Sequence, residues 1–97
     1  MIVRLVRLTF HAHHLEAFEA LFWTHRDAIA AQPGCQSVEL MADPTNPCVR
    51  LTLSRWDSEE SLNAYRKSAL FGQVWPSTKA LFDESPEAWT YHTKASE

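Results

Sequence analysis

Five histidines include the residues of this chain best suited to proton transfer. His11, His13 and His14 crowd into one short segment, but no cysteine or carboxylate lies at a spacing that would complete a metal site. We therefore predict a solvated turn there and no bound metal. His25 and His92 are the candidate catalytic bases, because an unperturbed imidazole titrates near pH ~6.5. The place of His25 on an apolar helix stripe is, however, more typical of a core or boundary histidine.

Arg50 and Thr52 are the other candidate catalytic residues, and both lie on the polar side of a predicted central strand. An arginine in such a place needs a partner. Glu39, on the neighbouring predicted strand, is the favoured structural partner, and a substrate carboxylate or phenolate is the functional alternative. The hydroxyl of Thr52 can hydrogen-bond a substrate carbonyl.

Aromatic residues are numerous enough to form the walls of a pocket for a planar substrate. Four tryptophans in 97 residues exceed what packing usually requires. Trp56, Tyr65 and Trp75 are the candidate substrate-binding residues, and Trp89 is a further aromatic group on the last predicted strand. Packing in the core explains each of them at least as well when it is considered alone.

The composition predicts one domain, residues 1–97, with a substantial core, since 45% of the residues are hydrophobic. A net charge of −3 with scattered Lys and Arg makes nucleic acid an unexpected partner. No apolar run approaches the ~20 residues that span a bilayer, so no membrane partner is expected. Cys35 and Cys48 form no CxxC pair, and we predict reduced, mostly buried thiols in a cytoplasmic protein.

Motifs of several enzyme classes are missing from the sequence. There is no nucleophile triad, no glycine-rich phosphate loop among only two glycines, and no carboxylate pair at catalytic spacing. These absences argue against hydrolysis by those mechanisms and against nucleotide chemistry.

The clearest structural signal is a strand that runs into a capped helix. Residues 49–53 alternate apolar and polar side chains, which is the pattern of a strand with one apolar face. Trp56 ends this strand on its polar side, and Asp57 with Glu60 predicts a capping box at the helix start. Similar periodicities place the other elements. We predict strands at 2–10, 35–41, 48–55 and 88–94, helices at about 14–32 and 58–70, a separate helical piece at 77–83 after Pro76, and fraying at 95–97.

The order β-α-β-β-α-β, with a short extra helix before the last strand, predicts an α+β ferredoxin-like plait with both long helices on one sheet face. Ile2, Val6, Leu8 and Phe10 share one face of the first strand, and the opposite face is also largely apolar. We expect this series and Trp56 to lie on the face without helices. Exposed apolar area costs ~25 cal/mol per Å², so two subunits are expected to stack these faces around a cavity.

Three short motifs together resemble the antibiotic biosynthesis monooxygenase (ABM) superfamily. They are Pro33-Gly34-Cys35, Ser54-x-Trp56-x-Ser58-x-Glu60 and Tyr65-x-x-Ser68-x-x-Phe71, followed by an aromatic last strand. The resemblance covers nearly the whole chain, and it implies a dimeric α+β barrel with one apolar cavity per subunit. Members oxidise anthrones or quinols with dioxygen and no cofactor, degrade heme, isomerise small phosphorylated signals, or have no assigned reaction. Resemblance to the oxidising members implies no cofactor here.

The site of the cofactor-free monooxygenases transfers to this chain only in part. Their tryptophan at the strand-to-helix corner matches Trp56, but their asparagine falls on Thr52 and their tyrosine on Leu62. Thr52 has no amide donor pair to hold a developing phenolate. Leu62 is accordingly expected to contact the substrate as part of the apolar wall.

The site of the heme-degrading branch transfers less well. Its asparagine, tryptophan and heme-ligating histidine fall on Val6, Tyr65 and Trp75, none of which ligates iron as histidine does. We therefore expect no heme degradation and retain Val6 as an apolar substrate contact.

These features favour a homodimeric, cofactor-independent monooxygenase that acts on a small electron-rich aromatic such as a quinol or an anthrone. The substrate would lose a proton and then give an electron to dioxygen. One alternative is a non-catalytic or stress-associated dimer that binds a small hydrophobic molecule, which the partial match to both catalytic sets favours. Another is an isomerase that transfers a proton.

Overall fold

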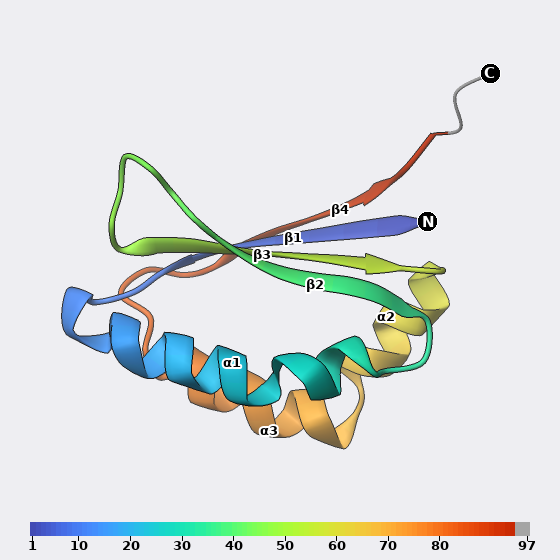
Figure 1. The fold of residues 1–97 in the computed structure, drawn as a ribbon, viewed down its shortest axis with the longest axis horizontal. Helices are drawn as coiled ribbons and strands as arrows, with labels where there is room; N and C mark the ends of the chain where they lie inside the picture. The colour runs from blue at the N-terminus through green and yellow to red at the C-terminus, as the bar shows by residue number, and fades with distance from the viewer. Residues whose placement is uncertain (95–97) are drawn as a thin grey trace.

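The computed structural model describes residues 1–94 and shows a four-stranded antiparallel sheet with its helices on one side (Figure 1). The elements are β1 (Ile2–Thr9), a 3-10 turn η1 (Ala12–His14), α1 (Leu15–Ala30), β2 (Cys35–Ala42), β3 (Val49–Trp56), α2 (Glu59–Arg66), α3 (Ala69–Lys79) and β4 (Glu87–His92). The strand order β2-β3-β1-β4 confirms the predicted ferredoxin-like plait. The predicted fraying at 95–97 lies outside the described residues.

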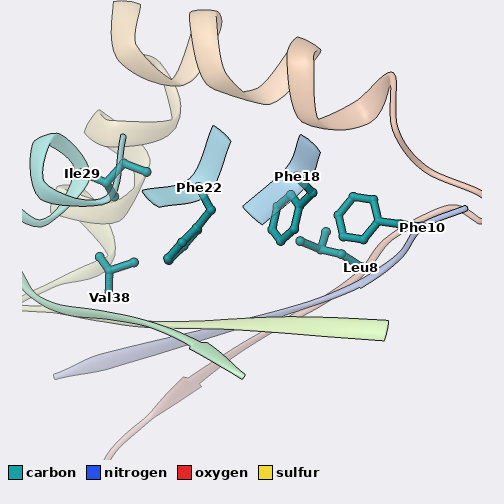
Figure 2. Packing of buried hydrophobic residues seen from close by; sticks show 6 residues of the cluster. All are labelled: Leu8, Phe10, Phe18, Phe22, Ile29 and Val38. Atoms are coloured by element: carbon teal, nitrogen blue, oxygen red, sulfur yellow. The ribbon is translucent and has the colours of Figure 1, made fainter. Parts of the chain in front are cut away.

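The side of the sheet that the helices cover is the opposite of the one predicted. Ile2, Leu8 and Phe10 are buried beneath the helices, and Trp56, paired with Ile2 across the sheet, has no exposed surface. Figure 2 shows Leu8 and Phe10 pointing from the sheet side towards the aromatic residues of α1. The ring centroids of Phe10 and Phe18 are 4.3 Å apart. The series of β1 residues that begins with Ile2 carries the larger side chains, and these fill the core between the sheet and the helices.

The other face of the sheet has no helix over it within residues 1–94 (Figure 1). Val3 and Leu5 of β1 point to this face, and cross-strand pairing places Leu53 opposite Leu5. The face also carries Leu51, Met41, Trp89 and Tyr91. Trp89 is 37% exposed and Tyr91 54% exposed. An apolar surface of this kind is typical of an interface.

The corner between β3 and α2 is closed by a glycine turn and a serine cap. Gly34 follows α1 with a φ of 82°, a conformation that favours glycine, and its carbonyl accepts a 2.8 Å hydrogen bond from the Asp57 amide. The N-cap of α2 is Ser58, whose hydroxyl accepts from the amide of Ser61. The predicted Asp57–Glu60 capping box is therefore wrong by one residue.

The break between the helices of the second half of the chain lies earlier and is shorter than predicted. The helical run stops at Lys67, and Ser68 caps a new helix, α3, which continues through Pro76 to Lys79. The interruption predicted at 71–76 is absent. Pro76 has no N–H to donate to the carbonyl of Gly72, so one helical hydrogen bond is missing while the helix continues.

The two cysteines are free and partly buried, in agreement with the prediction of reduced, mostly buried thiols. Antiparallel pairing separates them, because Cys35 lies opposite Trp56 at one end of β3 and Cys48 precedes Val49 at the other end. Burial raises the pKa of the Cys35 thiol, which makes it a poor nucleophile at neutral pH.

Candidate active site

A cavity of about 250 Å³ lies between the sheet and the helices. It is lined mainly by apolar and aromatic side chains, with a few polar groups from β1, β3, α2 and α3. Its lining includes Arg4, Val6, Thr52, Ser54, Trp56, Leu62, Tyr65, Arg66, Phe71, Trp75 and Thr78. Small-molecule sites commonly measure ~300–1,000 Å³, so this cavity suits a small ligand.

An aromatic ladder forms one wall of the cavity. The ring centroids of Trp56 and Tyr65 are 5.2 Å apart in a stacked arrangement, and Tyr65 meets Phe71 edge-on at 5.3 Å. Phe71 stacks on Trp75 at 5.7 Å, and Trp75 meets Phe82 edge-on at 5.7 Å. These contacts link the end of β3 through α2 to α3, and the rings offer flat apolar surfaces.

The indole of Trp56 serves as a wall and not as a hydrogen-bond donor to a ligand. Its Nε1–H donates a 2.9 Å hydrogen bond to Oγ of Ser54, two residues earlier on the same face of β3. The side chain is wholly buried against Ile2 and Leu62. The strand-to-helix corner therefore fixes the orientation of the ring.

Tyr65 contributes a neutral hydroxyl to the cavity. Burial, together with the nearby Cys35, raises the pKa of Tyr65 to about 12. The phenol therefore stays protonated at neutral pH and can donate a hydrogen bond, but it cannot act as a base there.

The structure brings together six of the nine residues proposed from the sequence. Those that line the cavity are Val6, Thr52, Trp56, Leu62, Tyr65 and Trp75. His25 and His92 do not line it, and neither does Arg50. The Nε of Arg50 lies 3.3 Å from Glu19 of α1, so its partner is this carboxylate and not the predicted Glu39.

Glu39 instead pairs with Arg55 at 3.5 Å on the uncovered face. The alternation along β2 explains the difference, because Glu39 and Arg50 point to opposite faces of the sheet. Arg50 also donates to the carbonyls of Pro47 and Val49. All of these contacts give Arg50 a structural role at the end of β3.

Two charged residues of the cavity, Arg4 and Arg66, were missed by the sequence analysis. Arg4 lies between Ile2 and Val6 on the covered face of β1, and Arg66 is the last residue of α2. Nη1 of Arg4 donates a 2.6 Å hydrogen bond to Oγ1 of Thr90 on β4. The alternation of β1 would have indicated Arg4 once the covered face was correctly assigned.

The histidine cluster forms the predicted turn. Within residues 1–94, no group of three or more possible ligands is arranged to hold a metal ion. The rings of His13 and His14 lie 4.1 Å apart, Nδ1 of His11 is 3.5 Å from Asp83, and Nδ1 of His14 is 3.4 Å from the carbonyl of Leu81. These contacts attach the turn to the segment that follows α3.

The ferredoxin-like plait with an aromatic-lined cavity between sheet and helices defines the class of small α+β proteins to which this chain belongs. The chain belongs to the antibiotic biosynthesis monooxygenase family, whose sequence model matches residues 1–75. No curated protein matches the chain. No helix within residues 1–94 is long and apolar enough to cross a bilayer.

Solved structures confirm the fold. A conserved protein from Methanosarcina mazei is 21% identical with a TM-score of 0.90, covering 97% of this chain and 94% of its own. A candidate antibiotic biosynthesis monooxygenase from Caulobacter crescentus is 18% identical with a TM-score of 0.91, covering 97% of this chain and 90% of its own. At these identities the likeness concerns the fold alone.

Proposed function

We propose that this protein is a cofactor-independent monooxygenase acting on a small electron-rich aromatic, such as a quinol or an anthrone. The observation that carries the proposal is the cavity, which is small, largely apolar and walled by the stacked rings of Trp56, Tyr65, Phe71 and Trp75. Membership of the monooxygenase family supports it.

The reaction proposed for an anthrone balances with dioxygen as the only oxidant. The substrate methylene loses a proton, the resulting anion gives one electron to dioxygen, and the two radicals combine into a peroxide at carbon. Cleavage of its O–O bond leaves one oxygen as a new carbonyl and releases the other with the two methylene hydrogens as water. A largely apolar cavity favours these steps because it limits the access of bulk water to the reactive anion.

The protein would contribute orientation more than acid–base catalysis. No imidazole or carboxylate appears among the cavity-lining residues of the described chain. Thr52 and the neutral phenol of Tyr65 can hydrogen-bond a substrate carbonyl or phenolate, which favours the ionised substrate. The substrate's first proton is then lost to water or to buffer.

Oxygen uptake with a panel of hydroquinones and anthrones tests this proposal. We expect turnover above the rate in buffer and incorporation of one ¹⁸O atom from ¹⁸O₂ into the product. Ala88→Phe, which fills space at the cavity, should lower the rate, whereas Ala17→Phe on the exposed side of α1 should not. Rates equal to those with heat-denatured protein across the panel would refute the proposal.

We also propose that two copies associate through the uncovered sheet face. The exposed apolar side chains of this face support association with a second copy. They include Trp89 and Tyr91 on β4, with Leu5 and Leu53 on the strands between β4 and β2. Light scattering at micromolar concentration should give the mass of a dimer. Leu53→Glu should give a monomer, and a wild-type monomer would contradict the proposal.

A non-catalytic binding protein is the second candidate function. The observation that favours it is the position of His25 and His92, both of which are outside the cavity. Native mass spectrometry that finds a co-purified small molecule, unchanged after incubation in air, would select this alternative over oxidation.

A further inference from the structure

We propose that the ligand of this cavity carries an ionised acidic group, of which a carboxylate is the best fit, and that Arg4 and Arg66 bind it. The proposal deepens the proposed function, since it concerns the substrate class of the same site. It depends on where the arginines of the chain find their partners.

The chain has six arginines, and four of them are paired with carboxylates. Those four are Arg7 with Glu87, Arg26 with Asp27, Arg50 with Glu19 and Arg55 with Glu39. The two that form no ion pair within residues 1–94 are Arg4 and Arg66, and both line the cavity. Within residues 1–94, the arginines that form no ion pair are thus both found at this one site.

Within residues 1–94, neither guanidinium group forms an ion pair, and none of the cavity-lining residues is an aspartate or a glutamate. The only side-chain hydrogen bond of Arg4 within the described chain goes to the neutral hydroxyl of Thr90. Burial first, and then the charge of Arg66, lowers the pKa of Arg4. An anion between the two groups would relieve their repulsion and replace lost hydration.

The position of the pair also suggests how such a ligand would lie. Arg66 is exposed and Arg4 is half-buried, so the charged part of the cavity lining reaches solvent. The interior is formed by apolar side chains and by the ladder that begins at Trp56 and Tyr65. A planar carboxylate matches the fork of a guanidinium, and a one- or two-ring aromatic body would occupy the interior.

Calorimetric titration without turnover tests the inference separately from oxidation. The probes are naphthalene-2-carboxylate and the nearly isosteric, neutral naphthalene-2-carboxamide, neither of which is a quinol or an anthrone. We expect the carboxylate to bind about tenfold more tightly or better, because a hydrogen-bonded charge pair commonly contributes that much or more. Equal affinities, or no binding of either probe, would overturn the inference.

Variants assign the preference to the two arginines. Arg66→Gln and Arg4→Gln should each weaken carboxylate binding by about tenfold and change carboxamide binding by less than about threefold. Lys67→Gln is the matched control, since it removes the same charge one residue away and outside the cavity lining. An equal loss in Lys67→Gln would show only a general charge effect and would overturn the inference. Retained carboxamide binding reports that each variant is folded.

The outcomes for the two proposals are distinguishable. A carboxylate preference that depends on the arginines, without oxygen uptake by any quinol or anthrone, would support this inference while refuting the monooxygenase. Oxygen uptake together with equal affinity for the two probes would support the monooxygenase and refute this inference.

Discussion

Substituting Gly34 by alanine tests whether the turn after α1 holds the cavity wall in place. Gly34 has a φ of 82°, and a Cβ built there would lie 2.5 Å from Cβ of Ser61 and closer still to its hydroxyl. The carbonyl of Gly34 also accepts from Asp57, the residue that follows Trp56. The turn, the first turn of α2 and the aromatic wall are therefore mechanically linked.

Two contributions set the size of the effect. A left-handed conformation costs an L-residue about 1–2 kcal/mol. The overlap with Ser61 adds roughly 1–3 kcal/mol, as for other over-packed positions. We expect Gly34→Ala to lower the free energy of unfolding by about 2–5 kcal/mol, a large part of the ~5–15 kcal/mol that stabilises a typical domain.

Urea unfolding followed by tryptophan fluorescence, at one fixed protein concentration, measures the loss. Ser61→Gly in the same background removes the overlap but leaves the strained φ, and Ser61→Gly alone gives the cost of a glycine in α2. The double-mutant cycle should return a favourable coupling of at least about 1 kcal/mol. A loss below about 0.5 kcal/mol in Gly34→Ala, or no coupling, would refute the account of this corner.

Three further predictions concern the cavity. Trp56→Phe removes the hydrogen bond to Ser54 and leaves unfilled space. It should lower the free energy of unfolding by about 1–3 kcal/mol, and an unchanged urea midpoint would contradict this. The pKa of Tyr65 is raised from about 10 to about 12 in the folded state. The neutral phenol therefore stabilises the fold fully below pH ~10, and this stabilisation is lost as the pH rises towards 12. Tyr65→Phe should flatten that part of a plot of urea midpoint against pH, and parallel curves for the two proteins would contradict the prediction. Thr52→Val keeps the shape but removes the hydroxyl, so it should raise KM for carbonyl substrates severalfold with little change in thermal stability, as measured by steady-state oxygen uptake and calorimetry.

The sequence was sufficient to predict the order of the elements and most of their boundaries. Periodicity identified α1 and the four strands because each has a distinct repeat of apolar residues. Capping was harder to predict, since Asp57 and Ser58 are both good N-cap residues. Tertiary contacts distinguish them, because the Asp57 amide donates to Gly34 and its carboxylate accepts from Gln36. The break at Ser68 was missed because Pro76 is a stronger local signal than a serine cap.

The aromatic residues that line the candidate site could be predicted from the sequence. Trp56, Tyr65 and Trp75 were identified from residue type and resemblance, and all three line the cavity. The polar groups were predicted less well, because a charged side chain on a strand finds its partner across the sheet or on a helix. Arg50 illustrates this, since its partner Glu19 lies 31 residues away on α1.

The covered face of the sheet and the missed arginines have one common cause. β1 is apolar on both faces, so its alternation alone cannot show which face meets the helices. If the series that contains Ile2 and Val6 lies outside, Arg4 becomes an ordinary surface charge; if it lies inside, Arg4 becomes a cation in an apolar cavity. A buried-side arginine without a carboxylate is costly, and a fold retains such a group most readily where something else compensates it. The position of the Ile2 series beneath the helices therefore also explains why an acidic ligand suits this cavity.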